Sequence, residues 1–289
     1  MSTEIVILYP SGRAAPNVGN ELSKHARDDV NLTLDSPSEA LPESGGIDSQ
    51  YRYLKSANAV TEYIIHAEEQ GYDGVVVACQ SEPGVSEARS AVNIPVIGTL
   101  RASCQIATQM GGRFSVIGDR QMSAITETKR IEDMGFRETL ASYRPVNLTT
   151  EQFETEPKSE VRDRIFDVMR RCVVDDYAEV IVSGCTLLLD VLGDDTTVSC
   201  AELGVPIADG QDVEVPIILP TVAGLKLCEV MIEMTHSVGY PAPVSRVGQY
   251  RDTPGDNDEW RQWLHSNVTP EAAYVTPEPD RPADDNENQ

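Results

Sequence analysis

Short apolar runs, rich in β-branched residues, alternate along this chain with longer segments whose apolar residues recur every three or four positions. The short runs predict buried strands, and the longer segments predict helices. Strands are expected at residues 4–9, 30–34, 73–79, 94–98, 113–118 and 179–185, with one more inside 136–146. Helices are expected at residues 51–70, 99–110 and 161–176, from residue 119 to about 133, in a short segment from Pro83, and again from Leu187.

The order of these elements repeats along the chain. In each half, a strand and a helix lead to a strand ending in cysteine, then to a short helix, a proline-containing apolar strand and a long helix. The proline-containing strands are IPVIG at residues 94–98 and the centre of GVPIADG at residues 204–210. We interpret residues 151–160 as an acidic loop and residues 211–220 as an insertion before the last helix.

Alternating strands and helices predict an α/β fold with parallel sheets. Together with the repeat, they predict two pseudosymmetric lobes, each a mainly parallel sheet flanked by helices. We expect the first lobe to comprise residues 1–98 and 207–240, and the second residues 99–206. Because ligands of parallel sheets bind beyond the carboxyl ends of the strands, the active site is expected in the cleft between the lobes.

Two of the predicted buried strands end at a cysteine. The run GYDGVVVAC ends at Cys79, and the run YAEVIVSGC ends at Cys185. A helix is expected soon after each cysteine, and a helix N-terminus lowers the pKa of a nearby thiol. Two thiols on opposite faces of a planar carbanion can remove a proton from one side and return one from the other, if one rests as thiolate and the other as thiol. This pattern predicts catalytic Cys79 and Cys185 and inversion of a stereocentre without a cofactor.

The simplest alternative is that both cysteines are small buried hydrophobic residues, as free cysteines often are. Their recurrence at equivalent places in the repeat favours the acid–base interpretation. None of the six cysteines has CxxC spacing, so the pattern does not indicate a disulfide framework or a zinc site. The remaining four lie inside predicted helices or a loop and are interpreted as structural: Cys104, Cys172, Cys200 and Cys228.

Charge narrows the choice of partners. The 47 acidic and 23 basic residues give a formal net charge of −24, which repels nucleic acid and anionic membranes. A dense carboxylate surface is tolerated where high salt screens it, so we predict a halophilic source, with an ordinary acidic protein as the alternative. Neither a secretory leader nor an apolar run of membrane-spanning length is evident, so a cytoplasmic location without membrane contact is expected.

Other site chemistries find little support in the sequence. The four histidines are scattered and have no metal-ligand spacing, although His25 or His66 approaching the cleft remains an alternative. There is no GxGxxG or GxxxxGK[ST] run, and no lysine lies in a context typical of a pyridoxal Schiff base. We therefore expect a small-molecule substrate, no metal and no cofactor.

The composition changes from residue 241 onward to proline, asparagine and acidic residues. Residues 241–289 are expected to form an acidic, proline-rich extension that is partly disordered. Within it, Trp260, Trp263 and Leu264 share one face of a possible short helix. That helix is expected to dock on this molecule or on a neighbouring subunit of a homo-oligomer, and a role in recognising substrate is the alternative.

Several motifs resemble those of the hydantoin racemases in the aspartate/glutamate racemase superfamily. They are YPS at residues 9–11, ACQSEPG at 78–84, IPVIG at 94–98, ASCQIA at 102–107, RFSVIG at 113–118 and SGCT at 183–186. The resemblance covers roughly residues 4–236. It implies a cofactor-independent racemase with Cys79 and Cys185 as the acid–base pair, acting on a 5-substituted hydantoin or a related amino-acid derivative. The expected substrate-binding residues are Pro10, Ser11, Gln80, Ser81 and Thr186.

The sequence also departs from the hydantoin racemase pattern. Glu82 stands where that family commonly has aspartate before Pro-Gly, and Ser11 stands where it often has asparagine. The GCT motif ending at Thr186 is closer to the glutamate racemase pattern. Four alternatives therefore stay open: an amino-acid racemase, a decarboxylase or cis-trans isomerase of the same fold, a non-catalytic small-molecule binding module, and a dithiol redox protein.

Overall fold

The chain divides into two compact units, Met1–Ser245 and Arg246–Gln289. The computed structural model describes only parts of the first unit, namely residues 2–10, 22–37, 46–47, 49–185, 188, 191–193, 195–205 and 212–240. The expected C-terminal extension, with Trp260 and Trp263, lies outside the described residues. Among the helices that are described, none combines the length and the apolar character needed to cross a membrane.

The first sheet has four parallel strands in the order β2-β1-β3-β4. Helices α2 and α3 contact it, and α2 begins at Ser49, whose side chain accepts the Arg52 backbone N–H. The central strands are rich in valine and isoleucine because helices cover both faces of the sheet. The elements are β1 (Thr3–Leu8), β2 (Val30–Asp35), α2 (Gln50–Glu69), β3 (Gly74–Val77), α3 (Val85–Ala91) and β4 (Val96–Gly98).

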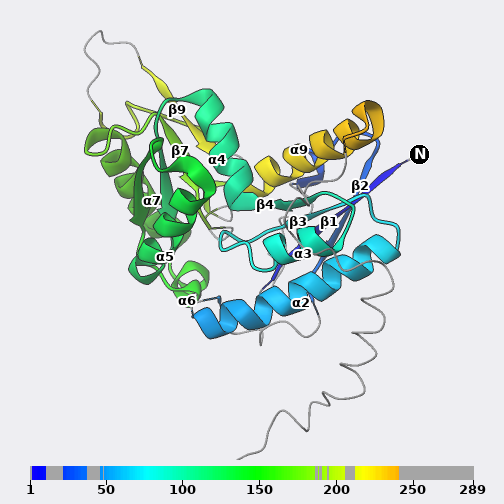
Figure 1. Ribbon diagram of the computed structural model, residues 1–289. Helices are drawn as coiled ribbons and strands as arrows, with labels where there is room; N and C mark the ends of the chain where they lie inside the picture. The colour runs from blue at the N-terminus through cyan, green and yellow to red at the C-terminus, as the bar shows by residue number, and fades with distance from the viewer. Residues whose placement is uncertain are drawn as a thin grey trace, which may run out of the picture. The chain divides into compact units, whose positions relative to one another are not determined.

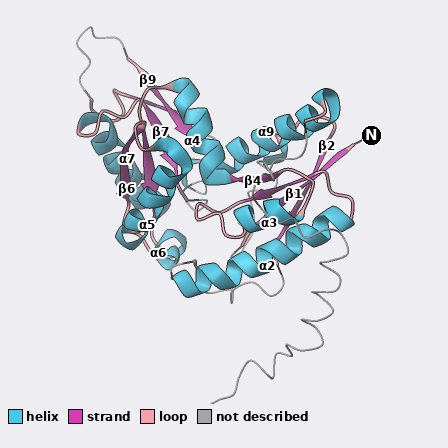
Figure 2. Cartoon of the chain, viewed as in Figure 1, coloured by secondary structure: helices cyan, strands magenta, loops and turns pink. Residues whose placement is uncertain are grey.

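The second sheet has the order β6-β5-β7-β9-β8, in which only the edge strand β8 is antiparallel to its neighbour. Figure 2 shows the strands of this sheet with helices around them. The elements are β5 (Phe114–Gly118), α5 (Gln121–Ile131), a π-helical turn (Glu132–Phe136), β6 (Leu140–Pro145), α6 (Thr150–Thr155), α7 (Lys158–Val174), β7 (Val180–Ser183), β8 (Thr197–Ser199) and β9 (Glu214–Ile218).

The repeat is visible in the strand order, because β6-β5-β7-β9 occupy the places of β2-β1-β3-β4. The prediction of an α/β fold with two mainly parallel sheets flanked by helices is confirmed. One detail was wrong: residues 211–220 are not an insertion, since β9 pairs with β7 inside the second sheet. The proline-containing strand that matches IPVIG is therefore VPII at residues 215–218, and the expected lobe boundary at residue 207 leaves β9 with the wrong sheet.

Two helices are exchanged between the sheets. Helix α4 (Thr99–Met110) follows β4 of the first sheet and packs on β7 and β9 of the second, whereas α9 (Pro220–Glu233) follows β9 and packs on β3 and β4. The two helices also pack on each other (Figure 1). A Cβ on Gly224 of α9 would lie 2.7 Å from Val76 Cγ1, so only glycine allows this approach. One buried cluster therefore contains residues of both sheets and of both exchanged helices.

Local signals explain two further differences from the expected elements. The acidic segment at residues 151–160 is not a loop, because α6 occupies its first half and α7 begins at Lys158. Thr149 and Gln152 form a reciprocal capping box at the start of α6, a pattern that the acidic composition masked. The short helix expected from Pro83 begins at Val85, after Gly84 with φ of 76°.

Candidate active site

Equivalent strands of the two sheets place the two cysteines. Cys79 is the second residue after β3, and Cys185 is the second residue after β7. Neither cysteine forms a disulfide within the described residues, and both residues are half-buried. The turn at Cys79 is closed by the Glu82 N–H, which donates to the Cys79 carbonyl at 3.1 Å. At the other cysteine, the Gly184 N–H donates to the Ile117 carbonyl at 2.7 Å.

The two cysteine loops meet where Gln80 contacts Gly184. A Cβ on Gly184 would lie 2.7 Å from both the Nε2 and the Oε1 atom of Gln80, so the amide group lies directly on the glycine backbone. Gln80 is the residue after Cys79, and Gly184 is the residue before Cys185. The tertiary structure thus brings together two loops that are about a hundred residues apart in the chain.

Tyr143 on β6 joins this cluster, although the sequence reasoning did not identify it. Its hydroxyl lies against the backbone of Gly118, where any side chain would overlap it. Tyr143 Oη and Gln80 Nε2 are both buried, and neither makes a hydrogen bond of ordinary geometry within the described residues. Burial raises the pKa of Tyr143, the charge of Cys185 acts in the same direction, and the Gln80 side chain opposes them. One feature of the sequence could have indicated Tyr143: it lies near the carboxyl end of the strand that pairs with β5.

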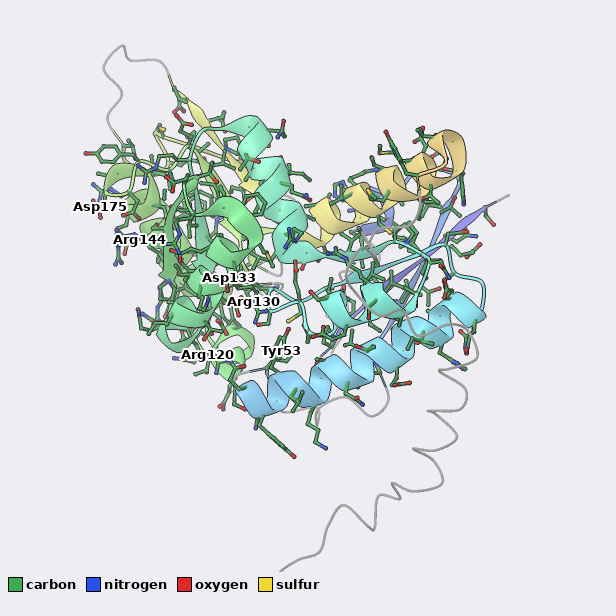
Figure 3. The ribbon with its side chains drawn as sticks, viewed as in Figure 1. Tyr53, Arg120, Arg130, Asp133, Arg144 and Asp175 are labelled. Atoms are coloured by element: carbon green, nitrogen blue, oxygen red, sulfur yellow. The ribbon has the colours of Figure 1, made fainter. Side chains whose placement is uncertain are left out.

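Ser81 and Glu127 connect the Cys79 loop to helix α5. Ser81 Oγ donates to Glu127 Oε1 at 2.9 Å, and Arg130 Nε pairs with Glu127 Oε2 at 3.2 Å. The Arg130 guanidinium lies 5.0 Å from the centre of the Tyr53 ring on α2, and Figure 3 shows these two side chains facing each other. The chain of contacts therefore joins elements from both halves of the repeat.

Glu82 is a buried carboxylate at the N-terminus of α4. It accepts the Arg101 backbone N–H at 2.7 Å and lies against Gly98, where a side chain would overlap the carboxylate. Burial raises the pKa of Glu82, while the Arg101 N–H and the nearby Arg89 and Arg101 guanidinium groups lower it. Its backbone has φ of 47°, an uncommon value for a residue with a side chain. The residue is thus part of the helix boundary rather than a free surface acid.

The environment of Cys79 differs from the one expected. The pKa of Cys79 is raised to about 12, with burial as the largest cause. The carboxylates of Glu127 and Glu82 also raise it, whereas a hydrogen bond from the Ser81 backbone N–H and the charge of Arg130 lower it. The expectation that a helix N-terminus favours the thiolate here was wrong. The pKa of Cys79 is raised instead, mainly by loss of hydration, and Glu127 and Glu82 add to this. Helix α3, which follows the loop, has only seven residues.

The other residues named from the sequence have varied places. Ser11 and Thr186 lie outside the described residues. Pro10 is buried, and its carbonyl accepts the Ser56 hydroxyl at 3.3 Å. His66 lies on the exposed side of α2 next to Glu69. The four cysteines interpreted as structural are all buried: Cys104, Cys172, Cys200 and Cys228.

These observations define an α/β protein of two related, mainly parallel sheets, each with a cysteine just beyond the carboxyl end of an equivalent strand. Residues 15–227, well over half of the chain, match the family described as Asp/Glu/Hydantoin racemase. The chain belongs to this family, and it is a racemase, an isomerase.

Three known proteins are similar to this chain in sequence or in structure. The hydantoin racemase of Pseudomonas sp. (strain NS671) is 28% identical over 233 residues, which cover 80% of this chain and 86% of that protein. The structure of allantoin racemase from Klebsiella pneumoniae has a TM-score of 0.69 and 23% identity, and the match covers 86% of this chain and 98% of that one. The allantoin racemase from Pseudomonas fluorescens has a TM-score of 0.72 and 18% identity, with 87% and 97% covered. Both structural matches concern the fold.

Proposed function

We propose that this protein inverts the acidic stereocentre of a 5-substituted hydantoin or a related amino-acid derivative, with Cys79 and Cys185 as the acid–base pair and no cofactor. The observation that carries the proposal is the contact between Gln80 and Gly184, which joins the two cysteine loops. The relative with 28% identity, a hydantoin racemase, supports the substrate class. The proposal includes a cytoplasmic homo-oligomer that works at high salt, as the net charge of −24 suggests.

The proposed reaction has two proton transfers. The thiolate of one cysteine removes the proton from the ring carbon between the carbonyl and the nitrogen, and the electron pair moves into the carbonyl as an enolate. The thiol of the other cysteine then returns a proton to the opposite face. The first cysteine ends as a thiol and the second as a thiolate, so charge balances and the enzyme is ready for the opposite enantiomer.

Loop residues near the two thiols are proposed to hold the substrate. Gln80 carries an amide beside Gly184, and its buried Nε2 makes no hydrogen bond of ordinary geometry within the described residues. Ser81 already donates its proton to Glu127, so its oxygen is available to accept a ring N–H. Pro10, Ser11 and Thr186 complete the proposed set.

The test uses single enantiomers in heavy water at high salt. The wild-type protein should racemise a 5-substituted hydantoin and incorporate solvent deuterium into both enantiomers. Cys79→Ala and Cys185→Ala should each abolish racemisation measured by polarimetry, because one of the two proton transfers is lost. Cys200→Ala, which removes a buried cysteine after β8, is the matched control and should keep the activity.

Separate substrates distinguish the alternatives. Full racemisation by both cysteine variants would overturn the two-thiol mechanism. Activity on aspartate or glutamate, with none on hydantoins including allantoin, would overturn the substrate class. Absence of both racemisation and deuterium exchange in the wild-type protein with every one of these compounds would favour a binding module.

A further inference from the structure

Glu127 is a buried carboxylate to which the proposed mechanism gives no role. It lies on α5 with 5% of its surface exposed. Its Oε1 atom accepts the Ser81 hydroxyl at 2.9 Å, and its Oε2 atom pairs with Arg130 Nε at 3.2 Å. Burying a carboxylate is costly unless it is paired and hydrogen-bonded, and both conditions are met here. The arrangement therefore places one buried negative charge beside the Cys79 loop.

Arg130 anchors this carboxylate from the opposite side. Its guanidinium lies over the Tyr53 ring, and its Nη1 atom is 3.5 Å from the Tyr53 hydroxyl (Figure 3). Tyr53 belongs to α2 of the first half, whereas Glu127 and Arg130 belong to α5 of the second. The position of Glu127 relative to the Cys79 loop is thus held at both of its oxygens.

The charged groups that act on Cys79 come from two segments, its own loop and α5. Glu127 raises the pKa of the thiol, and Arg130 lowers it. Burial raises the pKa of Glu127 itself, whereas Arg130 and Ser81 lower it. The groups facing Cys79 are Glu82, Glu127 and Arg130, and those facing Glu127 are Ser81, Asp119, Arg130 and Tyr143.

A two-base racemase needs unlike proton states on its two thiols, and a repeated backbone alone provides no preference between them. We propose that Glu127 is a positioning residue that holds the Cys79 loop through Ser81 and keeps Cys79 as the protonated thiol of the resting pair. This inference rests on the proposed function: if Cys79 is the protonated thiol, Cys185 is the base of the two-thiol reaction. A negative charge beside Cys79 disfavours its thiolate whatever the reaction is.

The experiment measures the rate at which iodoacetamide alkylates Cys79 in the full-length protein, by peptide-resolved mass spectrometry between pH 8 and 10. Glu127→Gln keeps the shape and the hydrogen-bond acceptor but removes the charge, so alkylation should be about 10-fold faster at each pH. Glu127→Asp keeps the charge and disturbs the contacts, so its rate should stay within about twofold of wild type. Glu132→Gln, which removes a carboxylate paired with Arg137, is the control and should leave the rate unchanged.

Each outcome decides the proposal. A wild-type rate in Glu127→Gln would overturn it, and equal acceleration in the Gln and Asp variants would reduce Glu127 to a packing role. Should Glu127→Gln fail to fold, Glu127→Gln/Arg130→Gln removes the pair without leaving an unpaired charge. The double variant should still react faster than wild type, because Glu127 raises the pKa of Cys79 more than Arg130 lowers it. Alkylation is independent of turnover, so loss of the proposed racemase function would not change this measurement.

Discussion

The two halves of the described chain share a strand order but surround their cysteines differently. Two buried carboxylates act on Cys79: Glu82 of its own loop, which accepts the Arg101 N–H of α4, and Glu127 of α5, which accepts the Ser81 hydroxyl. Cys185 follows a glycine on which the Gln80 amide packs. The repeat therefore sets where the cysteines lie, while the side chains around them differ between the two halves.

The exchanged helices show the same contrast. The Glu82 carboxylate caps α4 by accepting the Arg101 N–H, whereas α9 starts with Pro220 and no described side chain caps it. Proline suits the first turn of a helix because its missing N–H would have no intrahelical partner there. The two helices occupy equivalent places, but the unpaired N–H groups at their N-termini are dealt with differently. Of the two arrangements, only the Glu82 cap of α4 places a charge near Cys79.

The largest expected effect tests the buried environment of Cys79, on which its difference from Cys185 depends. Burial raises the pKa of Cys79 from 9.0 to about 12, so its thiolate fraction should grow tenfold per pH unit throughout the range below that value. Alkylation of Cys79 by iodoacetamide should therefore increase about 1000-fold between pH 7 and pH 10. N-acetylcysteine, measured in parallel, should level off near its own pKa. A plateau for Cys79 below pH 10 would contradict its buried environment.

An intermediate effect is expected where the two cysteine loops meet. Gly184→Ala introduces a Cβ into the position of the Gln80 amide, which must move. Overpacking of this kind costs about 1–3 kcal/mol of unfolding free energy. Displacement of a substrate-positioning loop by an ångström lowers kcat/KM by about 100-fold. Thermal unfolding and polarimetry measure the two effects.

Gly46→Ala is the matched control for that substitution. Its Cβ would lie 3.7 Å from an Arg120 nitrogen, an ordinary contact, so both stability and activity should stay near wild type. Unchanged activity in Gly184→Ala would show that the contact between Gln80 and Gly184 has no part in the reaction.

The smallest expected effect concerns α6 of the second half. Thr149→Ala removes the hydroxyl that caps α6, at a cost of about 1 kcal/mol in the free energy of unfolding by urea. Thr126→Ala, an exposed position inside α5, should change it by no more than about 0.5 kcal/mol. Racemase activity should survive in both, and a large loss in Thr149→Ala would show that α6 supports the active site.

Local patterns were sufficient to predict many of the elements. Helix α4 was expected at residues 99–110 and is found at Thr99–Met110, because its apolar spacing and flanking glycine are local signals. The cysteines at the ends of β3 and β7 were evident for the same reason. Strand β9 was missed because two proline-containing runs, at residues 204–210 and 214–218, compete for one place in the repeat. Only pairing with β7 decides between them.

By itself, the sequence determined the α/β class, the repeat, the family and the two cysteines placed just after their strands. The tertiary structure alone decided that α4 and α9 are exchanged between the sheets and that the Ser81 hydroxyl donates to Glu127. It also decided that the pKa of Cys79 is raised rather than lowered. The reason is how far apart in the sequence the interacting residues lie. Secondary structure depends on residues a few positions apart, whereas the ionisation of a thiol depends on hydration and on charges such as Glu127, which lies 46 residues from the serine it contacts.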